Sequence, residues 1–98
     1  MAGYWIVKGT ISDAEAYQAY AKLWGPIAER FGARFIAGGG AHETREGADF
    51  ERVAIVAFES YEQARACYDD PEYRVALDVA MKAYDPAKPR ELVIVEGS

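Results

Sequence analysis

His42 is the residue best suited to proton transfer, because it is the only histidine and imidazole titrates near neutral pH without a large perturbation. It follows Gly38, Gly39 and Gly40, whose flexibility would let the backbone carry the imidazole over a pocket. This placement predicts a catalytic acid–base role for His42, with an exposed loop histidine as the alternative. The three glycines lack the spacing of phosphate-binding loops and indicate a bulge or bend in a strand.

Tyrosine and tryptophan are frequent in the segments expected to be helical. Each combines a large apolar ring with one polar group, which suits the wall of a pocket for a planar organic ligand. We expect Tyr20, Trp24 and Tyr73 to contribute to ligand binding, with core and dimer packing as the alternative. Trp24 is the preferred candidate, because Pro26 should kink or break the helix beside it.

Two arginines, Arg34 and Arg52, lie in expected strands, where a charged side chain needs a carboxylate partner or access to water. We expect one of them to anchor an acidic ligand through a bidentate contact, and Arg34 is the chosen candidate. A salt bridge to Glu43, Glu46 or Glu51 is the alternative.

Cys67 is the only cysteine, and its apolar helical setting predicts a buried, unreactive thiol. One histidine and one cysteine are too few for a typical metal centre, so the sequence predicts no metal site. If the chain is an enzyme, we expect chemistry without a cofactor.

The composition predicts a single folded domain over residues 1–98, with 51% hydrophobic and 28% charged residues. The net charge of −5, without a cluster of lysines and arginines, predicts no nucleic-acid partner. No apolar run approaches the ~18 residues that a membrane span needs. The N-terminal residues lack the pattern of a secretory signal, and a lone cysteine permits no intrachain disulfide. We therefore expect a cytoplasmic protein with no membrane partner.

Apolar runs predict four strands, and capping residues predict where the helices start. The expected strands are Gly3–Ile11, Arg34–Ala37, Arg52–Glu59 and Arg90–Glu96. Capping boxes at Ser12 with Glu15 and at Ser60 with Gln63 should begin the helices, and Asp70-Pro71 should restart the second one. The expected buried stripes are Ala16, Tyr20, Leu23, Ile27 and Phe31 in the first helix and Tyr73, Leu77, Ala80, Met81 and Tyr84 in the last.

The order β-α-β-β-α-β is that of the ferredoxin-like α+β fold, an antiparallel sheet with its helices on one face. The expected strands are nevertheless apolar on both faces, as in Leu92–Val95. A bare apolar face of that size is unusual on a soluble monomer. We therefore expect two sheets to pack face to face in a homodimeric α+β barrel.

Four segments resemble the bacterial family called domain of unknown function 1330 (DUF1330), and the resemblance covers nearly the whole chain. These segments are Gly3–Val7, Arg34–Gly39, Tyr68–Tyr73 and Leu92–Gly97. The family more often has serine in place of Asp70, a change that keeps the helix cap. The resemblance implies a dimeric α/β barrel, in the broad superfamily of small cofactor-free monooxygenases and muconolactone isomerases. It implies no particular reaction, because the family has no agreed activity or catalytic residues.

Two hypotheses about function follow from the sequence. In the first, a homodimer binds a small organic molecule in a pocket between helices and sheet, and by fold analogy it is a monooxygenase- or isomerase-like enzyme. In the second, the chain is a non-catalytic dimeric module that binds a ligand or only self-associates. An enzyme should have a closed, partly polar cavity with His42 or an arginine pointing in, whereas a structural module should fill that space with tyrosine and tryptophan side chains.

Overall fold

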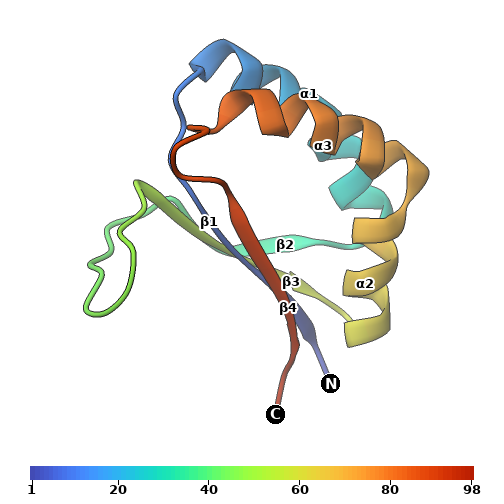
Figure 1. Ribbon diagram of the computed structural model, residues 1–98. Helices are drawn as coiled ribbons and strands as arrows, with labels where there is room; N and C mark the ends of the chain where they lie inside the picture. Colours follow the sequence, from blue (N-terminus) through green and yellow to red (C-terminus); the bar gives the residue numbers. More distant parts are fainter.

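The computed structural model describes residues 1–98 and shows four strands and three helices (Figure 1). The strands are β1 (Gly3–Gly9), β2 (Arg34–Gly38), β3 (Arg52–Phe58) and β4 (Glu91–Glu96). The helices are α1 (Ala14–Arg30), α2 (Tyr61–Asp69) and α3 (Pro71–Ala83). All strand pairs are antiparallel, in the order β2-β3-β1-β4, which confirms the predicted ferredoxin-like α+β fold.

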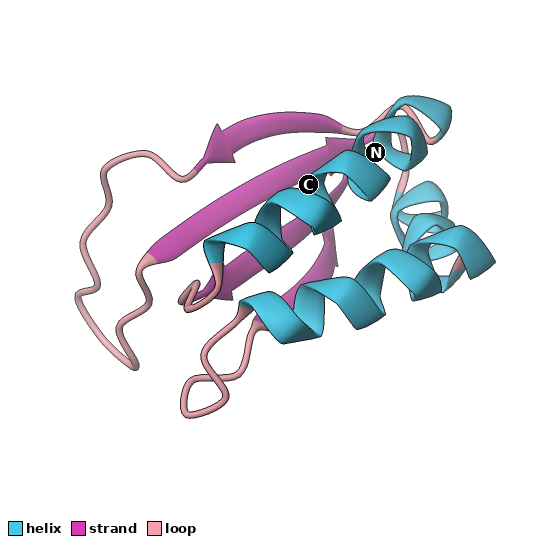
Figure 2. Ribbon diagram, turned by 90° about the horizontal axis from the view of Figure 1, so that it is seen from above, coloured by secondary structure: helices cyan, strands magenta, loops and turns pink.

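The helices cover one face of the sheet, with α1 and α3 side by side above it (Figures 1 and 2). Alternation along β1 explains this layering, because Trp5 and Val7 are buried beneath the helices while Tyr4 and Ile6 point to the opposite face. One core cluster fills the space between sheet and helices. No helix is both long and apolar enough to cross a membrane.

Helix α1 begins one residue later than the sequence predicted. Asp13, not Ser12, is the N-cap, and its Oδ1 accepts a hydrogen bond from the Ala16 amide at 3.0 Å. The Ser12 amide instead donates to the carbonyl of Ala83, which holds the chain beside α3. The first strand was expected to reach Ile11, but β1 ends at Gly9, where the chain turns toward the helices.

The predicted caps of the other two helices are confirmed. The Ser60 hydroxyl accepts from the amide of Gln63, and the Asp70 carboxylate accepts from the amides of Glu72 and Tyr73. Pro71 occupies the first turn of α3, where its missing N–H costs no hydrogen bond.

Helix α1 continues through Pro26, so of the predicted kink or break near Trp24 the break is wrong. The buried stripe is also rotated, because Trp24 is buried while Leu23 is 41% exposed. The large indole takes the inward position by stacking on Trp5. In α3 the small residues Ala76, Ala80 and Ala83 are fully buried, whereas Met81, expected inside, is exposed. We attribute this to the close approach of α3 to the core that alanines permit.

The opposite face of the sheet carries an apolar patch that no helix covers, with Lys8, Arg34 and Glu91 on the same face. Ile6 pairs with Ile55 on one side and Val93 on the other, which forms an aliphatic row across three strands. Val93 is 59% exposed and Val95 is 45% exposed, both unusually open for valines in a sheet.

Candidate functional site

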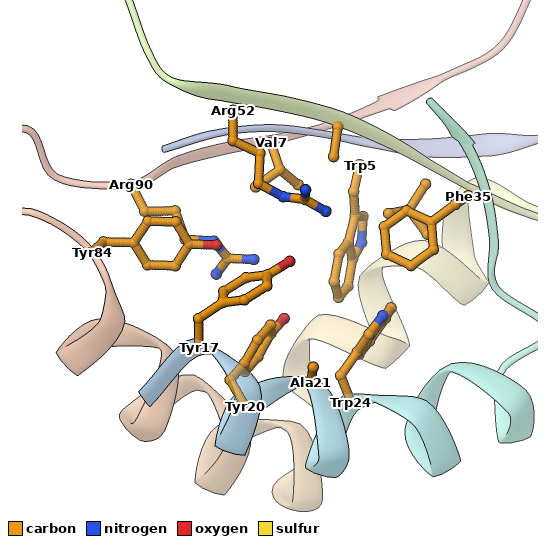
Figure 3. Close-up of a pocket in the computed structure, with 12 residues that line it drawn as sticks. Trp5, Val7, Tyr17, Tyr20, Ala21, Trp24, Phe35, Arg52, Tyr84 and Arg90 are labelled. Carbon is orange, nitrogen blue, oxygen red and sulfur yellow. The ribbon is translucent and has the colours of Figure 1, made fainter. Parts of the chain in front are cut away.

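A cavity of about 310 Å³ lies between α1 and the helix-facing side of the sheet (Figure 3). Its lining consists of Trp5, Val7, Tyr17, Tyr20, Ala21, Trp24, Phe35, Arg52, Ala54, Val56, Tyr84 and Arg90. Ala21 and Phe35 are exposed although they line it, so the cavity opens to solvent between α1 and β2. Its volume is at the lower end of the range of about 300–1,000 Å³ for small-molecule sites.

Strand parity decides which side chains reach the cavity. On β3, Arg52, Ala54 and Val56 share the face beneath the helices, because successive side chains alternate. On β2, Phe35 pairs with Val56 and therefore points to the same side, while its neighbour Arg34 pairs with Ala57 and points away.

The deeper wall of the cavity is aromatic. The rings of Trp5 and Trp24 stack with centroids 5.3 Å apart and an interplanar angle of 29°. The Trp5 indole N–H donates to the Ala64 carbonyl at 2.9 Å, which fixes that ring from behind. Fixed aromatic rings rather than mobile aliphatic chains therefore form this wall.

Arg90 enters the cavity from the segment between α3 and β4, and its guanidinium contacts three tyrosines. Its Nη1 and Nη2 both donate to the Tyr73 hydroxyl, each at 3.3 Å. Its guanidinium carbon lies 5.7 Å from the Tyr20 ring centroid and 5.5 Å from that of Tyr84. Its Nε is buried and has no hydrogen-bond partner. Burial alone would lower the pKa of Arg90, but the tyrosine oxygens raise it, so the guanidinium stays charged.

Arg52 provides a second guanidinium, which lies 5.4 Å from the Tyr17 ring centroid. Gly39 makes room for it, because a Cβ at that position would collide with Arg52 Nη1. Gly39 also has a φ of +81°, which a glycine adopts without strain. The chain bends at Gly39 just beyond the end of β2, in agreement with the predicted bulge or bend, whereas the bulge of β2 lies earlier, between Phe35 and Ala37.

Neutral phenols surround the two arginines. The hydroxyls of Tyr20 and Tyr73 lie 3.1 Å apart, and burial, followed by the proximity of Tyr73, raises the pKa of Tyr20. Burial likewise raises the pKa of Tyr84. Gly9 lies against the Tyr84 ring so closely that any side chain at this position would displace it.

The structure brings together only some of the residues predicted from sequence. Tyr20 and Trp24 line the cavity, whereas Tyr73 lies behind it and reaches it through its contacts with Tyr20 and Arg90. Arg34 is exposed on the opposite face and does not line the cavity.

His42 also lies outside the cavity lining, in the exposed loop between β2 and β3. Its Nε2 is 2.9 Å from the Phe50 carbonyl and its Nδ1 is 3.3 Å from that of Gly40. Hydrogen bonding to these two carbonyls raises the pKa of His42. Cys67 is fully buried as expected, and burial raises the pKa of its thiol to about 12.

The main functional candidate that sequence reasoning missed is Arg90. The available signal was its parity, because Arg90, Leu92 and Ile94 occupy alternate positions and therefore share one face. The salt bridge left open for Arg52 does not form, since neither it nor Arg90 has a carboxylate partner within 4.0 Å.

The family model described as Domain of unknown function (DUF1330) matches residues 2–98. The chain belongs to this family. The match covers all four strands of the DUF1330 chain and every residue that lines the cavity. No curated protein matches the sequence.

Solved structures with the same fold include a protein of unknown function from Rhodopseudomonas palustris, with a TM-score of 0.76 and 21% identity over 99% of this chain and 82% of that one. A dimeric ferredoxin-like protein of unknown function from Jannaschia sp. CCS1 has a TM-score of 0.74 and 12% identity over 99% and 100% of the two chains. A third, from Nitrosomonas europaea, is described provisionally as an antibiotic biosynthesis monooxygenase. It has a TM-score of 0.56 and 21% identity over 98% and 89%. At these identities the likeness establishes the fold of the DUF1330 chain and no activity.

Proposed function

We propose that this DUF1330 protein is a homodimer that binds a small planar organic molecule in the cavity of each subunit. The observation that carries the proposal is the open cavity of about 310 Å³ with the stacked pair Trp5 and Trp24 as its wall. A module that only self-associates has no need of such a space, and close packing of protein interiors disfavours leaving it open. Arginines also point into the cavity, one of the features that the sequence hypotheses assigned to an enzyme (Figure 3). The cavity is open to solvent, whereas those hypotheses expected a closed one.

Two observations support the homodimer. The uncovered sheet face carries a continuous aliphatic row through Ile55, Ile6 and Val93, which pairing with a second copy would bury. The similar proteins from Jannaschia sp. CCS1 and Thermobifida fusca are themselves described as dimeric and ferredoxin-like.

The proposal concerns binding and assigns no reaction. The cavity lining supplies tyrosine hydroxyls and guanidinium groups, while His42, our candidate for proton transfer, lies in the loop outside it. The fold analogy with the Nitrosomonas europaea protein gives no residue to which a step could be assigned.

The test is an NMR titration with neutral aromatic compounds, benzamide and 2-naphthamide, that monitors the indole N–H signals of the two tryptophans. We expect at least one compound to shift the Trp24 signal in a saturable manner. An Ala21→Trp variant, which places an indole at the cavity mouth, should abolish the shift. Ala19→Trp, on an exposed position of the same helix outside the lining, should not.

The absence of any saturable shift with both compounds would refute the proposal. An equal response of the two tryptophan variants would refute it too, because binding would then occur elsewhere on the surface.

A further inference from the structure

We propose that the ligand is the anion of a planar organic acid with one or two rings, and that its carboxylate binds between Arg52 and Arg90. The inference rests on the proposed function, since it names the chemical class of the molecule in the same cavity.

The charges of the chain provide the first argument. The sequence has 16 acidic residues against 11 lysines and arginines, so carboxylates are abundant. The ion pairs nevertheless involve only Arg30, Arg45 and Arg74 among the arginines. A guanidinium withdrawn from water without a counter-ion is unfavourable. Arg52 and Arg90 therefore lack the counter-ion that a buried guanidinium usually has.

The hydrogen bonding of Arg90 provides the second argument. A guanidinium has five N–H donors, and here two of them share one phenol oxygen at 3.3 Å while Nε has no acceptor. The faces of Tyr20 and Tyr84 hold the group in place without satisfying its donors. A carboxylate offers two oxygens in the plane that arginine prefers.

The sheet register explains how the two arginines come to act together. Arg52 pairs with Gly9 on one side of the central strand β1. On the other side Glu91 pairs with Lys8, which places Arg90 beside Gly9 as well. Two strand spacings separate the arginine backbones, a distance of about 10 Å. Gly9 has no side chain, so the ring of Tyr84 lies directly over it between the two arginine backbones. Both guanidiniums are directed past this ring into the cavity (Figure 3).

The rest of the cavity selects for the ring. The arginines and Tyr84 lie toward one end of the cavity, and the stacked Trp5 and Trp24 with Phe35 lie toward the other (Figure 3). A ligand with a charged head and a flat apolar body matches both ends at once. An inorganic anion such as phosphate would match only the arginine end.

The test compares acids with neutral amides of the same shape, in which an NH2 group replaces one carboxylate oxygen: benzoate with benzamide, and 2-naphthoate with 2-naphthamide. Isothermal titration calorimetry at fixed pH and ionic strength should give at least one acid that binds the wild type about tenfold more tightly than its amide. Arg52→Gln and Arg90→Met should each remove most of this preference while leaving amide affinity within about threefold. Arg34→Gln removes an arginine that the cavity does not contain, so it should leave the preference unchanged.

Equal affinity for acid and amide would overturn the carboxylate inference and leave the proposed binding function standing. Failure of all four compounds to bind would overturn both. A preference for the acid that persists in Arg52→Gln and in Arg90→Met would also overturn the inference. So would competition by inorganic phosphate at the concentration of the acid, because the arginines would then bind any small anion.

Discussion

Replacement of Arg90 by methionine should stabilise the unliganded protein while it impairs ligand binding. The wild-type guanidinium gains two cation–π contacts, worth up to about 2 kcal/mol each in a site withdrawn from water, and two long hydrogen bonds to one neutral oxygen. Against these stand an unsatisfied Nε, which costs about 1–3 kcal/mol, and the withdrawal of an unpaired charge from water. Methionine keeps the length of the side chain, removes both penalties and adds apolar contact.

The balance predicts a gain of about 1 kcal/mol in the free energy of unfolding of the ligand-free Arg90→Met variant, and for a domain of this size a rise in Tm of about 4–8 °C. Urea denaturation at constant protein concentration is the appropriate assay, because the stability of a dimer depends on concentration. The m-value should not change, since the surface exposed on unfolding is nearly the same. Arg65→Met, at an exposed position of α2 away from both the cavity and the uncovered sheet face, is the matched control and should lie within about 0.5 kcal/mol of wild type.

Addition of a saturating acid should reverse the order of stability. A ligand at about 100 times its wild-type Kd stabilises the wild type by about 2.7 kcal/mol and a variant that binds it tenfold more weakly by about 1.4 kcal/mol. The difference slightly exceeds the expected gain from methionine. The wild type should then be more stable than Arg90→Met. A loss of more than about 1 kcal/mol in the ligand-free variant would refute the reasoning, because Arg90 would then be a structural residue that its tyrosine neighbours already satisfy.

Three further predictions concern the dimer and the response to pH. Val93→Asp should give a folded monomer by light scattering, because it places a charge on the uncovered sheet face. Val56→Asp should instead unfold the chain, because Val56 is buried under the helices. An intact Val93→Asp dimer would contradict the proposed interface. The hydrogen bond from Arg30 lowers the pKa of Asp70, so the stability that this carboxylate confers is present above its unfolded pKa near 3.9 and is lost as the pH falls through the folded pKa. The urea midpoint of Asp70→Asn should not show this loss at acid pH. Midpoints of the variant and the wild type that fall in parallel with pH would contradict the prediction. The pKa of His42, measured by NMR, should lie above 6.5, so His42 should contribute stability below its unfolded pKa that is lost as the pH rises through the folded pKa. A pKa at or below 6.5 would show that its two carbonyl contacts are not formed.

The sequence predicted the fold well, because the signals that define it are local. The caps at Ser60 and Asp70 and the apolar runs mark the elements to within one or two residues. The helix faces were less certain, since Leu23 and Trp24 are adjacent and only the stacking on Trp5 decides which of them points inward.

The site was predicted only in part, because its charged residues depend on tertiary register. Tyr20 and Trp24 were found from residue type alone. The sequence analysis chose Arg34 over Arg52 as the arginine that binds the ligand. In the bulged strand β2, Phe35 pairs with Val56 and points toward the helices, so its neighbour Arg34 points to the opposite face. Tyrosines from two helical segments that are far apart in the sequence surround Arg90, and no short sequence motif predicts such an arrangement.

The most direct test of the central claim is a crystal structure of the protein grown with 2-naphthoate. We predict a dimer joined through the uncovered sheet face, with one ligand in each cavity. The naphthalene ring should lie against Trp5 and Trp24, and the carboxylate should lie within hydrogen-bonding distance of both Arg52 and Arg90. A ligand bound outside the cavity, or one whose carboxylate points to solvent with the two arginines unengaged, would contradict the account.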